Sequence, residues 1–190
     1  MTATQSQDLA ELREILRKKS VQFGTFTLVS GQTSDVYVDC KLTTCDPRAM
    51  PMIGRLFLAK MDEKGWSPDA VGGLTLGADP IAFAIARESI NRQGLAPIDA
   101  FIVRKERKPH GMQKLVEGIA ETEGRKVVIL DDVCTKGEST ATAIRNANSV
   151  GMEILGAICL IDREAGASEL LRTEFGVELA SIFKLSDFRK

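Results

Sequence analysis

Two adjacent carboxylates, Asp131 and Asp132, offer the clearest chemistry in this sequence. They follow a run of four apolar residues, and a short segment of small and hydroxyl residues that ends near Thr140 comes next. In an open α/β sheet, ligands bind beyond the carboxyl ends of the strands, and the N-terminus of the following helix attracts anions. Carboxylates suit sugar hydroxyls or a divalent cation, and a turn with free N–H groups suits a phosphate. The stretch therefore indicates a phosphorylated sugar, against the alternative of an ordinary strand with a solvated acidic end.

A second candidate is the basic segment 104–111, which holds four cations and the only histidine, His110, within eight residues. Lysine, arginine and Mg²⁺ stabilise the negative charge that develops on a departing pyrophosphate. His110 adds a donor or proton-transfer group near neutral pH. Pro109 and Gly111 would let the segment close as a lid. The alternative is a solvated basic loop.

A third candidate is the glycine-rich segment 72–79, which we expect as a loop between a short strand and a helix. Backbone N–H groups in such a loop can hold phosphate oxygens, and glycine permits their close approach. A tight turn without a ligand is the alternative.

The elements that would position these residues alternate between strand and helix. Apolar periodicity predicts an amphipathic helix over 6–20 and a hairpin of strands 21–28 and 35–40 that turns at 30–32. Asp46 and Pro47 are expected to open a helix that Gly65 ends. The remaining expected strands are 70–72, 100–104, 116–119, 127–131, 154–161 and 178–183, and the remaining helices are 79–91, 139–150 and 167–175.

This alternation predicts the α/β class, with a parallel sheet flanked by helices. We expect a single domain over 1–190, because 190 residues form one substantial core and are short for two. Within it, about residues 1–45 should form a small β-containing hood over the carboxyl ends of the strands, and 46–190 the core.

The composition and the charge of the chain exclude some classes of binding partner. The formal net charge of −1 provides no global field for nucleic acid or a membrane surface. The N-terminal residues do not resemble a signal peptide, and no apolar run is long enough to cross a membrane. The four cysteines, Cys40, Cys45, Cys134 and Cys159, form no C-x-x-C pair, so we expect reduced thiols and a cytoplasmic location.

Four motifs together resemble those of the orotate phosphoribosyltransferases, which are type I phosphoribosyltransferases. They are F-T-L-x-S-G at 26–31, R-K-E-x-K-x-H-G at 104–111, D-D-V-x-T-x-G at 131–137 and D-R at 162–163. The resemblance implies that orotate and phosphoribosyl pyrophosphate (PRPP) react to give orotidine 5′-monophosphate and pyrophosphate, with Mg²⁺, in pyrimidine synthesis. It also implies a homodimer with a shared active site.

The resemblance also assigns roles to residues of this chain. The PRPP-binding residues it implies are Arg104, Lys105, Lys108, His110, Asp131, Asp132, Val133, Cys134, Thr135, Lys136, Gly137, Glu138 and Ser139. The catalytic residues among them are Lys105, Lys108, His110, Asp131 and Asp132. Orotate would contact Thr135, Arg163, Tyr37 and Val38. Arg163 also fits on physical grounds, because a guanidinium binds a carboxylate through two hydrogen bonds. Mg²⁺ would be held mainly through PRPP, with Asp131 or Asp132 as further candidates.

Two positions depart from the enteric members of the family, which carry lysines where this chain has Val29 and Gly77. Lys41 is our candidate for replacing one of these cations. Two other functions share the PRPP chemistry. A purine-base phosphoribosyltransferase would not depend on Arg163. A non-catalytic, PRPP-sensing regulator would lack the basic loop, and a basic face for nucleic acid is typical of such proteins.

Overall fold

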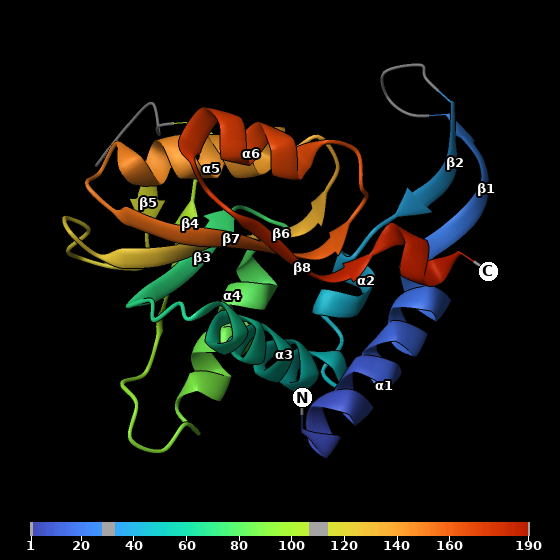
Figure 1. Cartoon of the computed structure of the whole chain (residues 1–190), viewed down its shortest axis with the longest axis horizontal. Coiled ribbons are helices and arrows are strands. Elements are labelled where there is room, and N and C mark those ends of the chain that lie inside the picture. Colours follow the sequence, from blue (N-terminus) through green and yellow to red (C-terminus); the bar gives the residue numbers. More distant parts are fainter. Residues whose placement is uncertain (1, 28–32, 107–113, 190) are drawn as a thin grey trace.

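The centre of the molecule is a six-stranded sheet in the order β5-β4-β3-β6-β7-β8 (Figure 1). The computed structural model describes residues 2–27, 33–106 and 114–189. The strands are β3 (Ala70–Leu74), β4 (Asp99–Val103), β5 (Val116–Glu117), β6 (Lys126–Cys134), β7 (Glu153–Asp162) and β8 (Leu179–Lys184). All pair in the parallel sense except the edge strand β5, which is antiparallel to β4. The predicted α/β class with a parallel sheet is confirmed.

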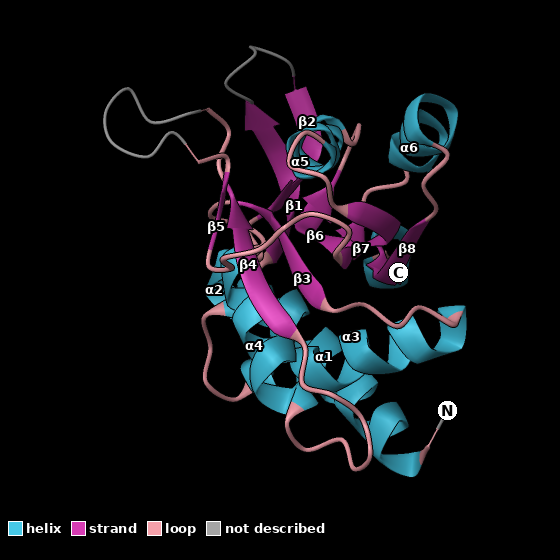
Figure 2. Cartoon of the chain, turned by 90° about the vertical axis from the view of Figure 1, so that its left-hand side faces the viewer, coloured by secondary structure: helices cyan, strands magenta, loops and turns pink. Residues whose placement is uncertain are grey.

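Helices cover both faces of this sheet (Figure 1, Figure 2). Helices α5 (Glu138–Asn148) and α6 (Ala167–Phe175) lie on one side, and α1 (Ala3–Lys19), α3 (Ala49–Lys64) and α4 (Asp79–Ser89) lie on the other. The apolar side chains of β6 point to both faces of the sheet, because both faces are buried at this strand. No helix in the described part of the chain is long and apolar enough to cross a membrane.

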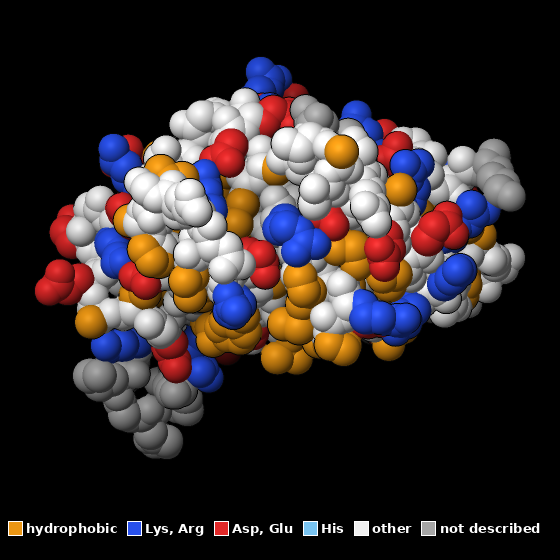
Figure 3. All heavy atoms as spheres, turned by 90° about the horizontal axis from the view of Figure 1, so that it is seen from below, with side chains coloured by type: hydrophobic (Ala, Val, Ile, Leu, Met, Phe, Trp, Pro, Cys, Tyr) orange, Lys and Arg blue, Asp and Glu red, His pale blue; other side chains and the backbone are white. Residues whose placement is uncertain are grey.

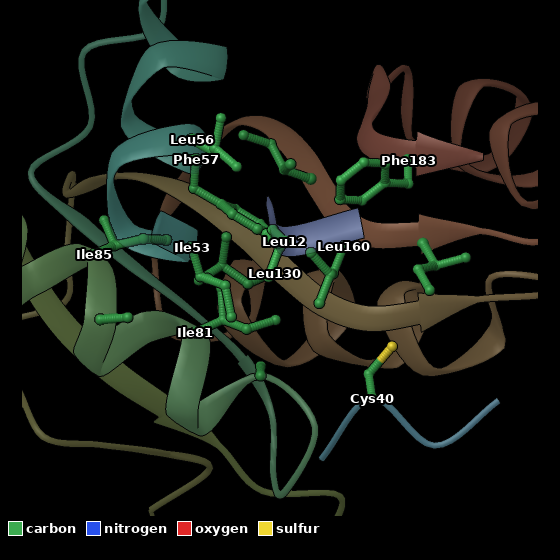
Figure 4. Packing of buried hydrophobic residues seen from close by; sticks show 14 of the residues in the cluster. Leu12, Cys40, Ile53, Leu56, Phe57, Ile81, Ile85, Leu130, Leu160 and Phe183 are labelled. Carbon is green, nitrogen blue, oxygen red and sulfur yellow. The ribbon is translucent and has the colours of Figure 1, made fainter. Parts of the chain in front are cut away.

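The larger hydrophobic cluster lies between the sheet and helices α1, α3 and α4. Figure 4 shows Leu130 and Leu160 of the sheet among side chains of these helices, which include Leu12, Ile53 and Ile81. Leu12 of α1 has no exposed surface. Helix α1 therefore packs with the core, and the hood consists of the segments that follow it.

The hood is an antiparallel hairpin of β1 (Val21–Thr27) and β2 (Thr33–Val38), followed by the short helix α2 (Lys41–Thr44). The hairpin is confirmed, its expected turn at 30–32 lies outside the described residues, and α2 was not predicted. A guanidinium N–H of Arg163, just after β7, donates to Ser34 Oγ at 3.4 Å, so the hood meets the carboxyl edge of the sheet as expected. The chain ends in a 3-10 helix (Leu185–Phe188), and Arg189 beyond it forms an ion pair with Asp35 of the hairpin.

Two strands extend two or more residues beyond their predicted carboxyl ends. Strand β6 was expected over 127–131, but its pairing with β7 continues to Cys134. Strand β3 was expected over 70–72, but it reaches Leu74, so Gly72 and Gly73 lie in the strand and not in a loop. A Cβ on Gly73 would stand 2.0 Å from the carbonyl oxygen of Leu130. These glycines thus allow neighbouring strands to pack closely.

Candidate active site

The side chains of Asp131 and Asp132, at the end of β6, lie in different parts of the site, because successive side chains of a strand point to opposite faces. Asp131 faces α5, where the Thr140 hydroxyl donates to its Oδ2 at 2.8 Å. Asp132 lies against the loop that follows β3, where a Cβ built on Gly77 would stand 2.5 Å from Asp132 Oδ1. Residues adjacent in sequence therefore reach the phosphate loop and the neighbouring strand's loop separately.

Asp131 is held in a buried hydrogen-bond network. Its side chain is 8% exposed, and its Oδ1 accepts the N–H of Asp132 at 2.9 Å. Cys134 Sγ lies 3.2 Å from Thr140 Oγ1, which completes the network on the side of α5. Burial raises the pKa of Asp131 to about 7; the Thr140 hydrogen bond opposes this rise, and the charge of Asp132 adds to it. This carboxyl group therefore changes its charge near neutral pH.

A pocket of about 280 Å³ lies between the end of β6 and the start of α5. Its lining comprises the first acid and the whole predicted phosphate segment: Asp131, Val133, Cys134, Thr135, Lys136, Gly137, Glu138 and Ser139. Gly137 precedes α5 with φ of 83°, a left-handed conformation that favours glycine. The first N–H groups of a helix have no partner within it, so they are available to an anion. The predicted phosphate cradle is thus assembled around one pocket.

Arg163 follows β7 and lies beside the same strand ends. Its backbone N–H donates to the carbonyl oxygen of Cys134 at 2.8 Å, which fixes the residue next to β6. Its Nε is buried and has no hydrogen-bond partner among the described residues. In that part of the chain no ion pair joins it to Asp162 or Glu164. A half-buried guanidinium with an unpaired N–H is suited to a carboxylate ligand.

The loop expected over 72–79 is reduced to residues 75–78, between β3 and α4. The Thr75 hydroxyl donates to Asp79 Oδ2 at 2.7 Å, and the Thr75–Leu76 peptide is cis. The Thr75 N–H donates to the carbonyl oxygen of Val103 at the end of β4. The loop therefore lies between Asp132 of β6 and the end of β4.

The basic segment is described only in part. Arg104 follows β4, and its Nη1 donates to Glu117 Oε1 at 3.0 Å. Lys105 is exposed. Lys108, His110 and Val29 lie outside the described residues. The assignment of these cations to pyrophosphate stays a prediction.

The proposed contacts to the orotate ring are not gathered on one surface. Tyr37 is 45% exposed, and its ring centroid lies 5.7 Å from that of Phe26. Val38, next along β2, packs partly buried against the main core on the other face. Thr135 lines the phosphate pocket. The roles of these three residues in binding orotate stay predictions.

The donor set fits a metal ion that is carried by a substrate. The described residues contain no group of three or more His, Cys, Asp or Glu side chains able to hold a metal ion. The side chains of Asp131 and Asp132 point away from each other, so a single metal ion would contact one of these carboxylates and not both. Mg²⁺ is commonly bound through one or two carboxylates together with water and substrate phosphates.

From the sequence, Thr140 was expected at the end of the phosphate segment, but it was assigned no role in the site. A signal was present, because Thr140, Ala143, Ile144 and Ala147 are spaced as one helical stripe, and all four are buried in α5. A hydroxyl on an otherwise apolar stripe indicates a buried hydrogen-bond partner.

Comparison with known proteins agrees with this arrangement. A model of the phosphoribosyl transferase domain matches residues 46–184. An orotate phosphoribosyltransferase of Mycobacterium tuberculosis (strain ATCC 25618 / H37Rv) is 43% identical over 180 residues, which covers 95% of this chain and 96% of that protein. The orotate phosphoribosyltransferase of Aquifex aeolicus (strain VF5) is 41% identical, with 93% and 95% covered. The chain belongs to the orotate phosphoribosyltransferase family.

A solved structure supports the same relationship at the level of the fold. The Mycobacterium tuberculosis H37Rv orotate phosphoribosyltransferase in complex with PRPP has a TM-score of 0.77 to this orotate phosphoribosyltransferase, at 39% sequence identity. The match covers 95% of this chain and 98% of the other. The resemblance inferred from four sequence motifs is confirmed.

Proposed function

We propose that this chain transfers the 5-phosphoribosyl group of PRPP to orotate, giving orotidine 5′-monophosphate and pyrophosphate, in de novo pyrimidine (UMP) biosynthesis. The observation that carries the proposal is the half-buried guanidinium of Arg163, whose buried Nε has no hydrogen-bond partner among the described residues, beside the phosphate pocket. Orotate carries a carboxylate, and the purine bases and uracil do not. Membership of the orotate phosphoribosyltransferase family supports the same choice of base.

The order of the strands suggests how the two substrates lie. Arg163 follows β7, the acids and the phosphate pocket follow β6, the loop 75–78 follows β3, and Arg104 follows β4. These four strands are consecutive neighbours in the sheet. We assign the orotate carboxylate to the β7 end, the ribose 5-phosphate to β6, and the pyrophosphate to the β3 and β4 end. In this arrangement the ribose, whose bond to pyrophosphate breaks, lies between the orotate acceptor and the pyrophosphate leaving group.

The chain's own residues act by positioning and by charge. The bond between ribose C1 and the pyrophosphate oxygen loosens, and the pyrimidine nitrogen attacks C1 from the opposite face, with no covalent enzyme intermediate. Asp131 and Asp132 orient the ribose hydroxyls and stabilise positive charge on the ring, while Lys105, Lys108 and His110 neutralise the departing pyrophosphate. Mg²⁺ bound to PRPP supplies additional positive charge to the leaving group.

We also propose a homodimer with a shared active site that works in the cytoplasm. Large hydrophobic side chains are exposed on several elements, for example Leu76 (71%), Phe83 (48%) and Leu42 (52%). Hydrophobic side chains also gather along the lower edge of the face seen in Figure 3. The free thiols of Cys40, Cys134 and Cys159, all buried, suit a reducing compartment. Sedimentation equilibrium across a range of protein concentrations tests the dimer.

The decisive assay follows the ultraviolet absorbance of orotate in the presence of PRPP and Mg²⁺, with adenine, guanine, hypoxanthine, xanthine and uracil in parallel. We expect orotate alone to be consumed. Turnover of a purine base in place of orotate would overturn the assignment of Arg163 and favour a purine-base enzyme. Binding of PRPP without turnover of any base would favour a non-catalytic sensor.

A further inference from the structure

The hood brings one cation, Lys41, to the acidic end of β6. Lys41 is the first residue of α2, and Cys40 before it is fully buried in the main core, beside Leu160 in Figure 4. The backbone at this point is therefore fixed against the sheet. The Lys41 side chain is 49% exposed, and its Nζ lies 2.8 Å from Asp39 Oδ1. An anchored backbone with a partly exposed ammonium group suits a residue that meets a ligand.

The charge of Asp132 acts on Lys41 in addition to that of Asp39. The hydrogen bond to Asp39 is the main cause that raises the pKa of Lys41, and the charge of Asp132 raises it further. Asp132 in turn lies against Gly77, where a Cβ would stand 2.5 Å from the carboxylate. Asp132 and Gly77 therefore lie together at the end of β6 that is next to β3, and Lys41 lies within electrostatic range of this carboxylate.

That side is the one to which the proposed function assigns pyrophosphate. Gly77 contributes no side chain there, and any side chain at position 77 would displace the Asp132 carboxylate. Asp132 itself carries the wrong sign for a polyanion. A cation in addition to those of the basic segment would offset this charge, and α2 supplies Lys41 within electrostatic range of Asp132.

We propose that Lys41 binds the pyrophosphate group of PRPP and stabilises it as it departs. The inference rests on the proposed function, because it concerns the leaving group of that reaction. An ammonium group near a polyanion gains from Coulomb attraction that the partly exposed site does not fully screen. Lys41 thereby links the hood, which meets the base at Ser34 and Arg163, to the opposite end of the substrate.

The test compares two variants, each of which removes one partner of the ion pair between Lys41 and Asp39. Lys41→Ala removes the cation, and Asp39→Asn removes its partner and leaves the cation in place. Pyrophosphate binding is measured by isothermal titration calorimetry, with and without Mg²⁺, alongside the KM values for PRPP and orotate. We expect Lys41→Ala to weaken pyrophosphate binding and raise the KM for PRPP roughly tenfold, a magnitude typical of one charge-assisted contact, with the KM for orotate unchanged within twofold.

Asp39→Asn should keep pyrophosphate binding within twofold of the wild type, and Lys41→Arg should restore most of what Lys41→Ala loses. Lys64→Ala is the matched control, because Lys64 forms an ion pair with Glu178 away from the strand ends of the site. Equal weakening by Lys41→Ala and Asp39→Asn would show a structural ion pair and overturn the inference. Unchanged pyrophosphate binding in Lys41→Ala would also overturn it. Failure of the wild type to consume orotate would instead overturn the proposed function, because pyrophosphate binding is measured without a base.

Discussion

Replacement of Asp131 by asparagine should remove activity and at the same time stabilise the folded chain above neutral pH. Asparagine retains one side-chain oxygen, which can accept the N–H of Asp132 as Oδ1 does, and its amide N–H can donate to the Thr140 hydroxyl at the position of Oδ2. It removes the charge that burial disfavours. Asp131→Asn therefore separates the cost of burying a carboxylate from the loss of its contacts.

The magnitude follows from the pKa of this carboxyl group. Burial raises it from 3.8 to about 7. A tenfold change in proton affinity corresponds to about 1.4 kcal/mol, so ionised Asp131 costs roughly 4 kcal/mol of folding free energy. A carboxyl group with a raised pKa in the folded state stabilises the fold fully below the pKa of the unfolded chain. That contribution is lost as the pH rises from about 4 through about 7.

The assay is urea unfolding of wild type and Asp131→Asn between pH 4 and pH 8.5, with chelator present and no substrate. The difference in unfolding free energy should favour the variant increasingly across this range and level off above pH 7.5. Glu121→Gln, at an exposed position, controls for the loss of one negative charge and should stay within about 0.5 kcal/mol at every pH. A difference for Asp131→Asn that does not change with pH would refute the argument that burial controls this group.

Three further substitutions test other parts of the site and the core. Thr140→Val should lower turnover more than PRPP affinity, because it keeps the shape of the side chain but removes the hydrogen bond that orients Asp131; steady-state kinetics would show the difference. Arg163→Lys should raise the KM for orotate roughly 10- to 100-fold, the loss of one charge-assisted pair, and leave PRPP binding unchanged by calorimetry. Gly156→Ala should destabilise the fold by about 1–3 kcal/mol in urea unfolding, since its Cβ would stand 2.2 Å from the Trp66 ring.

Two of these substitutions, Thr140→Val and Gly156→Ala, have a matched control in the chain. Thr142→Val removes an exposed hydroxyl from the same helix, and it should leave turnover unchanged. Gly24→Ala adds a methyl group at a position where the nearest atoms are 3.4 Å away, and its unfolding free energy should stay close to that of the wild type. Equal effects of Thr140→Val and Thr142→Val on turnover would contradict the positioning role of Thr140.

The sequence predicted the sheet because its signals were local and strong. The apolar run that ends at Leu130 identified β6, and the acids that follow it identified the ligand edge. It did not predict that the strand would continue beyond Asp131, because the pairing that extends it to Cys134 depends on β7, which is distant in the sequence. The opposite orientation of the two acids follows from that extension.

Other features depended on contacts that a sequence pattern does not reveal. Gly72 and Gly73 looked like loop residues, but they are needed because neighbouring backbones leave no room for a Cβ. The contact between Ser34 and Arg163 joins residues 129 positions apart, and neither type nor spacing indicates it. Arg163 was nevertheless named as an orotate-binding candidate, because the family resemblance implies that role and its guanidinium suits the carboxylate of orotate.

The division of the site between the hood and a single strand–turn–helix unit has an evolutionary consequence. The phosphate pocket is lined by residues of one contiguous segment, 131–139, whereas the base is assigned to the contact between β2 and the end of β7. Substitutions at that contact would alter which base is accepted and leave the pocket for the ribose phosphate intact. New acceptor specificities could therefore arise on this scaffold by changes at one end of the row of strands, without a period in which PRPP binding is lost.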